Sequence, residues 1–186
     1  MSFDDCIEHS KALARLVSEG NFDPSFVLGI AKGGMLPAQI ISEYLERPLA
    51  AIHVERPLTG LKKGLGLRRL PQGMKTFLRK AEMSLGLYRR MERRVIKNFS
   101  GDFAEGRCLI VDDSLDTGKT VSTVIEYLSS EFGIVRSEIE IAVITQMYED
   151  ADPPADYCTF RNINFCFPWS LDSGDYGRFL EFIESS

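Results

Sequence analysis

Residues 108–120 of this chain read CLIVDDSLDTGKT, and this stretch decides the fold class. Leu109, Ile110 and Val111 form an uninterrupted apolar run, which predicts a strand covered on both faces of a parallel sheet. Asp112 and Asp113, hereafter the acid pair, follow at the carboxyl end of that strand, where ligands bind in open α/β sheets. The sequence therefore predicts a strand that delivers two carboxylates to a binding site.

The turn that follows, residues 116–120, has the composition of a phosphate site. It precedes a helical pattern, so its backbone N–H groups lie at a helix N-terminus, where the helix dipole favours an anion. Gly118 lets the backbone approach an anion closely, and the hydroxyls of Thr117 and Thr120 add donors. Two carboxylates beside such a turn suit a ribose 5-phosphate, whose vicinal hydroxyls need acceptors. A Walker A loop is excluded, because the chain contains no GxxxxGK[ST].

Residues 110–120 resemble the signature of type I phosphoribosyltransferases, in which an apolar strand, an acidic pair and a D-T-G-x-T turn bind 5-phosphoribosyl 1-pyrophosphate (PRPP). By this resemblance the acid pair holds the ribose hydroxyls, and Asp116 is catalytic, accepting a proton or orienting the acceptor nitrogen. The resemblance also implies Mg²⁺, which the acid pair holds partly through PRPP. The PRPP-binding residues expected in this stretch are Asp112, Asp113, Ser114, Leu115, Thr117, Gly118, Lys119 and Thr120.

The turn Ala31-Lys32-Gly33-Gly34 follows an earlier apolar run and lies on the same edge of the predicted sheet as the acid pair. Its two glycines expose successive N–H groups as an anion nest, and Lys32 supplies positive charge to a leaving group that becomes more negative. In the family the first loop binds pyrophosphate and often carries a strained or cis peptide before its basic residue, and Ala31–Lys32 resembles that position. We therefore expect Ala31 and Gly33 to bind PRPP and Lys32 to be catalytic.

Residues 165–178, FCFPWSLDSGDYGR, resemble the base-binding region of hypoxanthine-guanine and xanthine-guanine phosphoribosyltransferases. By that similarity Phe165 or Trp169 flanks the acceptor ring. Asp172 approaches the metal-bound pyrophosphate, and Arg178 contacts the pyrophosphate itself. The alternative is that the aromatic rings, which alternate at the period of a strand, simply cover the core.

Strands and helices alternate along the chain, which predicts an α/β fold with a doubly wound parallel sheet, Rossmann-like, and right-handed crossovers. The length fits one domain over residues 1–186, with residues 156–175 as a small aromatic hood and a last helix near residues 176–183. Further strands are predicted by the apolar runs at residues 26–30, 49–54 and 139–145.

The four cysteines form no CxxC pair, and Cys108 lies in a predicted buried strand, which favours reduced thiols and a cytoplasmic protein. No apolar run is long enough to cross a membrane. Residues 1–16 carry acids and predict an amphipathic helix rather than a signal peptide. The side chains expected to face inward from that helix are Phe3, Ile7, Leu13 and Leu16.

Residues 53–99 contain 13 basic and three acidic residues, a net charge of +10 in a chain whose total is −5. A helical pattern at residues 74–95 predicts a basic, partly helical insertion where the family carries its mobile active-site loop. Three interpretations stay open: a solvated face paired with acidic surface or a second subunit, a surface at residues 62–97 for an anionic acceptor or peripheral membrane contact, and a nucleic-acid surface. The last is disfavoured, because no nucleic-acid-binding module is recognisable.

Together these residues predict an enzyme that transfers the 5-phosphoribosyl group of PRPP to an acceptor and releases pyrophosphate. The resemblance favours a purine-type nucleobase in salvage, with Gln146 binding the acceptor near the place where the purine enzymes carry a lysine. Two alternatives stay open: transfer to a glycan or other hydroxyl acceptor, and a PRPP-sensing regulator without catalysis. The expected partners are PRPP, a small-molecule acceptor and further copies of the chain in a homo-oligomer.

Overall fold

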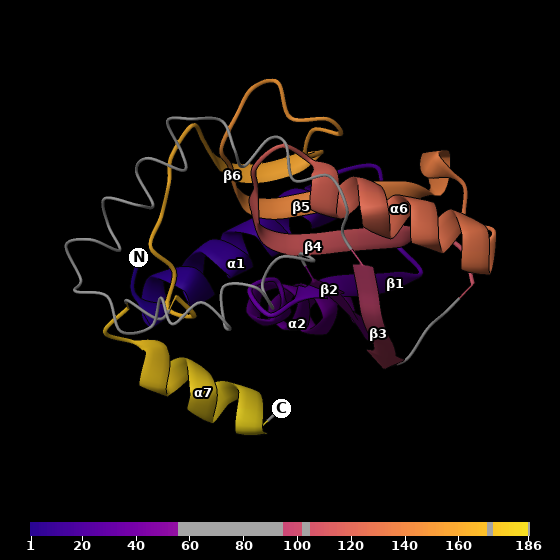
Figure 1. The fold of residues 1–186 in the computed structure, drawn as a ribbon. Coiled ribbons are helices and arrows are strands. Elements are labelled where there is room, and N and C mark those ends of the chain that lie inside the picture. The colour runs from indigo at the N-terminus through magenta and orange to yellow at the C-terminus, as the bar shows by residue number, and fades with distance from the viewer. Residues whose placement is uncertain (56–94, 102–104, 171–172, 186) are drawn as a thin grey trace, which may run out of the picture. The chain divides into compact units, whose positions relative to one another are not determined.

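The structure, a computed structural model, describes residues 1–55, 95–101, 105–170 and 173–185. Two compact units divide the chain, one made of Met1–Val54 and Ile96–Ser186 and the other of Glu55–Val95. Almost all of the second unit, and with it the predicted basic insertion, lies outside the described residues. The sheet and its helices belong to the first unit (Figure 1).

Six strands form one sheet: β1 (Phe26–Ala31), β2 (Leu49–Glu55), β3 (Val95–Gly101), β4 (Cys108–Leu115), β5 (Ile139–Gln146) and β6 (Tyr157–Arg161). Their order across the sheet is β3-β2-β1-β4-β5-β6. The pairs from β2 to β6 are parallel, as the sequence predicts. Gly101 at the end of β3 lies against Leu49 and Ala50 at the start of β2, so these two strands are antiparallel. This edge strand was not predicted, since the helical pattern before it runs into its first residue.

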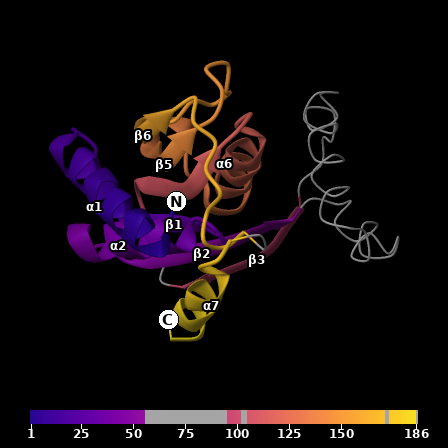
Figure 2. The same cartoon turned by 90° about the vertical axis from the view of Figure 1, so that its left-hand side faces the viewer.

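Helices cover both faces of this sheet (Figures 1 and 2). α1 (Phe3–Glu19) and α2 (Met35–Leu45) lie on one face, and α6 (Lys119–Phe132) lies on the other. A short 3-10 helix, η2 (Arg136–Glu138), leads from α6 to β5, and α7 (Tyr176–Ser185) ends the chain. The arrangement is the doubly wound α/β fold that the alternation of strands and helices predicts.

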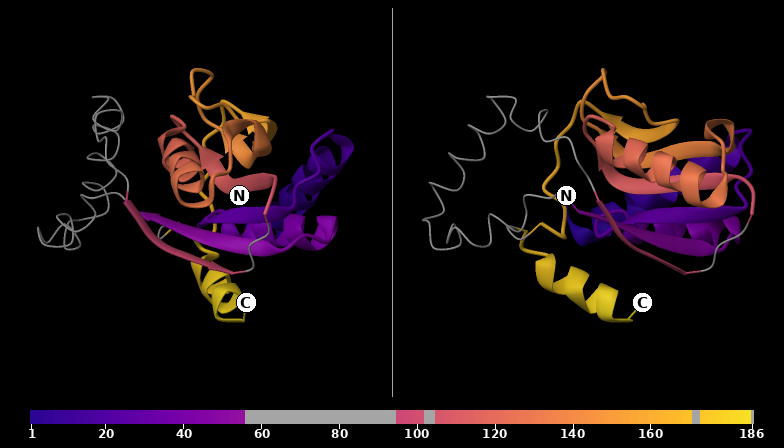
Figure 3. Two further views of the ribbon diagram at one scale, coloured as in Figure 1. Left: turned by 90° about the vertical axis from the view of Figure 1, so that its right-hand side faces the viewer. Right: turned by 45° about the vertical axis from the view of Figure 1, so that its right-hand side comes forward.

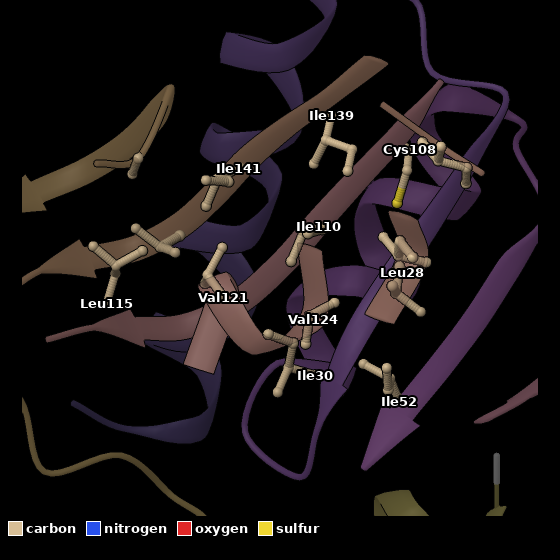
Figure 4. Close-up of a cluster of buried hydrophobic side chains, with 14 of the residues drawn as sticks. Leu28, Ile30, Ile52, Cys108, Ile110, Leu115, Val121, Val124, Ile139 and Ile141 are labelled. Atoms are coloured by element: carbon tan, nitrogen blue, oxygen red, sulfur yellow. The ribbon is translucent and has the colours of Figure 1, made fainter. Parts of the chain in front are cut away.

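Successive residues of the central strands face opposite layers. Ile110 packs against Val124 of α6 in one buried cluster (Figure 4), whereas its neighbour Leu109 packs in a second cluster with Leu13 of α1. All four side chains are fully buried. β4 is thus covered on both faces, as its continuous apolar run predicts. The prediction that Leu16 faces inward is wrong, because α1 presents a different stripe to the sheet and leaves this side chain 42% exposed.

The C-terminal segment runs from β6 past the N-terminus of α1 to α7 (Figures 2 and 3). The strand β6 was expected to belong to a hood, but it pairs with β5 as the edge of the main sheet. The Met1 ammonium donates to the carbonyl of Cys166 at 3.3 Å, and the Phe3 N–H donates to Oδ2 of Asp175 at 3.0 Å. Phe179 of α7 is buried in the core on the α1 side. The two ends of the chain are therefore packed together.

All four cysteines are free, as expected for reduced thiols. Burial raises the pKa of Cys6 to about 12 and also raises the pKa of Cys108. Both thiols are therefore protonated and unreactive near neutral pH. Among the described residues, no helix is both long enough and apolar enough to span a membrane.

Candidate active site

The acid pair lies within β4, because the strand continues beyond the apolar run. The run ends at Val111, but β4 continues to Leu115 because β5 supplies ladder partners up to Gln146. The backbone N–H of Asp113 donates to Oδ1 of Asp112 at 2.9 Å, which fixes the first carboxylate beside the second. Both side chains are half-buried at the carboxyl edge of the sheet. The strand therefore presents two adjacent acceptors at a defined place.

Burial raises the pKa of both carboxyl groups of the acid pair, and the charge of Asp113 raises the pKa of Asp112 further. The indole N–H of Trp169 acts in the opposite direction on the pKa of Asp113, because it donates to Oδ2 at 2.5 Å and stabilises the ionised form. Two desolvated carboxylates held together are stabilised by any hydrogen-bond donor that reaches them. Each hydrogen bond replaces lost hydration and reduces the repulsion between the two groups. A vicinal diol is a ligand of this kind.

The turn after β4 brings the proposed base and the expected phosphate-binding residues together. Ser114 Oγ donates to Oδ1 of Asp116 at 3.4 Å, a long bond that orients the carboxylate. α6 begins at Lys119, and no side chain caps its N-terminus. The first turn of a helix carries N–H groups without helical partners, so an uncapped N-terminus can accept an anion.

Gly118 is required in this turn by its backbone and by its surroundings. Its φ is 81°, in the left-handed region, and a Cβ atom there would collide with the backbone carbonyl of Asp152. The N–H of Asp152 donates to the carbonyl of Thr117 at 3.3 Å, and Ser122 Oγ donates to the Asp152 carbonyl at 3.3 Å. The loop after β5 therefore holds the turn from outside. Nothing in the local sequence indicated this support.

The loop after β1 packs onto the acid pair. The Ala31–Lys32 peptide is cis, as the resemblance to the family implies for this position, and the Lys32 side chain is exposed. A Cβ atom on Gly33 would lie 2.5 Å from Oδ2 of Asp113, and one on Gly34 would lie 2.6 Å from a backbone oxygen of β4. Only glycines allow this approach. It brings the loop at residues 31–34 beside the acid pair, so the two predicted anion sites lie at the same edge of the sheet.

Trp169 reaches the acid pair from the C-terminal segment. Its ring stacks on Phe167, with centroids 5.0 Å apart and 8° between the planes, and Phe179 lies 5.6 Å away. Phe165 packs edge-on against Phe167 at 6.0 Å. Both rings expected to flank the acceptor therefore belong to an aromatic cluster continuous with the core. The bond from Trp169 to Asp113 was not predicted, because it spans 56 positions and leaves no local pattern.

Gln146 is buried, and both ends of its amide are engaged within the protein. Nε2 donates to the carbonyl of Tyr148 at 2.9 Å, and Oε1 accepts from the N–H of Ala155 and from Nη1 of Arg161, each at 3.1 Å. The side chain thus ties the end of β5 to β6 and to the loop between them, and the expected role of Gln146 in binding the acceptor stays a prediction. The cation at this strand end is Arg161, which lies opposite Gln146 in register.

Arg178 lies on α7 and pairs with Asp4 of α1. Its terminal nitrogens donate to the two carboxylate oxygens at 2.9 and 3.1 Å, and the guanidinium lies over the Phe3 ring, 5.1 Å from its centroid. The contact of Arg178 with pyrophosphate that the resemblance implies stays a prediction. Asp172, expected near the metal, lies outside the described residues. Within the described part of the chain, no group of three or more His, Cys, Asp or Glu side chains is arranged to hold a metal ion.

Comparisons with known proteins agree with this geometry. The family model of the phosphoribosyl transferase domain matches residues 5–173. The structure is similar to purine phosphoribosyltransferase from Pyrococcus horikoshii, with a TM-score of 0.63 and 27% identity over 93% of each chain. It is also similar to xanthine-guanine-hypoxanthine phosphoribosyltransferase from Helicobacter pylori, with a TM-score of 0.62 and 16% identity, covering 100% of this chain and 97% of that one. No curated protein is significantly similar in sequence.

Proposed function

We propose, on the premise that this chain belongs to the phosphoribosyl transferase domain family and is a phosphoribosyltransferase, that its acceptor is a purine-type nucleobase. One observation above all supports this proposal: the acid pair, the turn at residues 116–120 and the loop at residues 31–34 lie at one edge of the sheet. PRPP offers one partner to each of them, namely a vicinal diol, a 5-phosphate and a pyrophosphate. The transfer joins the ribose to the base and releases the pyrophosphate.

In this proposal the acid pair accepts hydrogen bonds from the ribose hydroxyls. Residues 117–120 bind the 5-phosphate through backbone N–H groups at the start of α6 and through the hydroxyls of Thr117 and Thr120. The two sites flank the sugar and hold its anomeric carbon in one place. Holding the reacting carbon removes much of the entropic cost of the displacement.

The displacement builds positive charge on the sugar and negative charge on the leaving pyrophosphate. The backbone of Gly33 and Gly34 and the exposed ammonium of Lys32 lie where that negative charge develops, so they stabilise it. Arg178 is paired with Asp4 at the protein surface. We therefore assign the main protein contribution to Lys32 and its loop.

Mg²⁺ fits this site by the chemistry of its donors. The acid pair supplies carboxylate oxygens, and Mg²⁺ is commonly held by one or two carboxylates together with substrate phosphates rather than by a cage of protein ligands. When bound, Mg²⁺ neutralises charge on the pyrophosphate. We assign Asp112 and Asp113 as its protein ligands, with Asp172 as a third candidate outside the described residues.

Asp116 is the proposed proton acceptor. It follows directly on β4, beside the phosphate turn, and its carboxylate is oriented by Ser114. A carboxylate at this place can take the proton that the attacking nitrogen of the base must lose.

The choice of a purine is supported by the 27% identity to a purine phosphoribosyltransferase over 93% of both chains. The aromatic cluster beside the acid pair adds ring surface on which a flat base can lie, with Phe165 and Trp169 as the predicted flanking residues. A single assay tests the proposal. Purified protein with PRPP and Mg²⁺ is offered purine bases, pyrimidine bases, sugars or no acceptor, and pyrophosphate release is measured. Release with purines only, with a nucleoside monophosphate as product, supports the proposal, whereas release with sugars only contradicts it.

A further inference from the structure

Three segments that are far apart in the sequence meet at one atom, Oδ2 of Asp113. The indole Nε1 of Trp169 donates to this oxygen at 2.5 Å. A Cβ atom on Gly33 would lie 2.5 Å from the same oxygen and 2.7 Å from Nε1. The backbone of the loop after β1 therefore closes over the hydrogen bond. This oxygen is therefore contacted by two other segments of the protein, the loop after β1 and the segment that carries Trp169.

The ring of Trp169 is itself held in place. It stacks on Phe167 at 5.0 Å and packs against Phe179 at 5.6 Å, and these two neighbours are only 5% and 1% exposed. A flat ring between two buried side chains has little freedom to turn, because protein interiors are close-packed. The direction of the indole N–H is thus set by the core of the protein.

We propose that Trp169, besides flanking the acceptor ring as proposed above, is a positioning residue of the sugar site that acts through Asp113. Its N–H holds Oδ2 against the Gly33 loop and so fixes the rotation of the carboxylate. A carboxylate has about four acceptor positions, and fixing one oxygen directs the others. This inference rests on the proposed function, because it takes the acid pair to bind the ribose hydroxyls. It adds that the aromatic segment sets the geometry of the PRPP site.

The proposed coupling between Trp169 and the sugar site also acts from the sugar to the ring. A ribose hydroxyl that donates to Asp113 changes the charge on the oxygen that the indole N–H contacts, so the emission of the ring responds to the sugar. Trp169 is the only tryptophan of the chain, so the indole emission comes from this ring alone and reports its surroundings, the bond to Asp113 among them. The response requires PRPP alone and no acceptor.

The main test is Trp169→Phe, which keeps an aromatic ring on Phe167 and removes the N–H donor. We expect the Kd for PRPP in the presence of Mg²⁺, measured by calorimetry, to rise about tenfold, because binding must then fix the rotation of a carboxylate that the indole no longer holds. The matched control is Tyr176→Phe, which removes a donor from another ring of the same cluster, 6.4 Å from Phe179. This control should bind PRPP like the wild type.

A second variant approaches the same oxygen from the other side and leaves the aromatic cluster intact. Gly33→Ala places a methyl group against Oδ2 and Nε1, so it should shift the Trp169 emission of the protein without any ligand. Gly133→Ala is its control, because nothing lies within 4 Å of a Cβ atom there, and it should leave the emission unchanged. This measurement stays decisive if Trp169→Phe fails to fold.

The outcomes separate the two proposals. A wild-type protein that does not bind PRPP overturns the proposed function and this inference with it. A wild-type protein that binds PRPP, together with a folded Trp169→Phe variant of equal affinity, overturns the positioning role alone. An emission spectrum that Gly33→Ala leaves unchanged also overturns it.

Discussion

Two of the segments at the acid pair place their side chains by different means: residues 108–120, which contain the pair, and residues 165–170. The first is local, since one strand, one turn and one helix N-terminus follow each other directly in the sequence. The second is brought there by packing, since Trp169 meets Asp113 across 56 positions and is held by an aromatic cluster. The difference teaches that local sequence specifies which groups are present at the site, whereas long-range contacts specify how they are oriented.

The largest effect is expected from substitutions in the local segment, residues 108–120. Asp112→Asn combined with Asp113→Asn should reduce PRPP affinity at least about a hundredfold, because two charge-assisted hydrogen bonds to the ribose are lost. The fold should persist, since both side chains are half-buried at the end of β4. Calorimetry with PRPP and Mg²⁺ measures the loss, and circular dichroism checks the fold. Unchanged affinity in a folded double variant would remove the acid pair from the sugar site.

The same double variant tests the desolvation of the acid pair. The pKa of each carboxyl is raised above 3.8 in the folded protein, so the folded state binds more protons than the unfolded chain between 3.8 and the folded pKa. These groups therefore lower stability as the pH rises through that window. We expect the double variant to have a higher Tm than the wild type near neutral pH, and the difference to shrink as the pH falls toward 3.8. A constant difference at every pH contradicts this account.

The next effect separates chemistry from binding within the local segment. Asp116→Asn should leave PRPP affinity close to that of the wild type, because the carboxylate makes no assigned contact with PRPP. Turnover with an accepted base should slow by roughly 10² to 10⁴, the usual contribution of a general base. Single-turnover kinetics at saturating PRPP measures it. Equal rates in variant and wild type exclude Asp116 from proton transfer.

A smaller effect tests how far long-range packing supports the local turn. Gly118→Ala should lower stability by more than Gly133→Ala, although both glycines have positive φ, 81° and 70°. Alanine at position 133 carries only the conformational cost, about 1 kcal/mol, because no atom lies within 4 Å. Alanine at position 118 also meets the Asp152 carbonyl and must displace the loop after β5. Urea unfolding of both variants gives the comparison, and equal losses would show that this loop does not support the turn.

The smallest effect concerns the C-terminal helix. Arg178→Gln should leave PRPP affinity nearly unchanged, because its guanidinium is paired with Asp4 on the protein surface. Lys32→Gln serves as the comparison and should weaken PRPP binding. A loss of affinity in Arg178→Gln as large as that in Lys32→Gln would mean that the pair with Asp4 opens when pyrophosphate binds.

The sequence predicts those parts of the fold and of the site that depend on residues close together in the chain. The apolar run predicted β4, but the glycine at position 118 was expected only for the approach of an anion, and its positive φ and its contact with Asp152 were not predicted. The edge strand β3 was missed, because a helical pattern precedes it. Gln146 and Arg178 were expected to bind ligands, which stays a prediction, and the structure adds protein partners for both side chains. Such partners come from other strands and helices, and no local pattern identifies them.

The close approach of Gly33, Asp113 and Trp169 also limits how this site can evolve. A larger residue at position 33 collides with the indole and the carboxylate, whereas a smaller residue at position 169 removes the donor that the carboxylate accepts. We therefore expect each single substitution to be deleterious, and a smaller ring at position 169 to relieve the collision that a larger residue at position 33 causes. Among the relatives of this chain we expect positions 33 and 169 to covary, with the tryptophan retained only where the loop keeps its glycine.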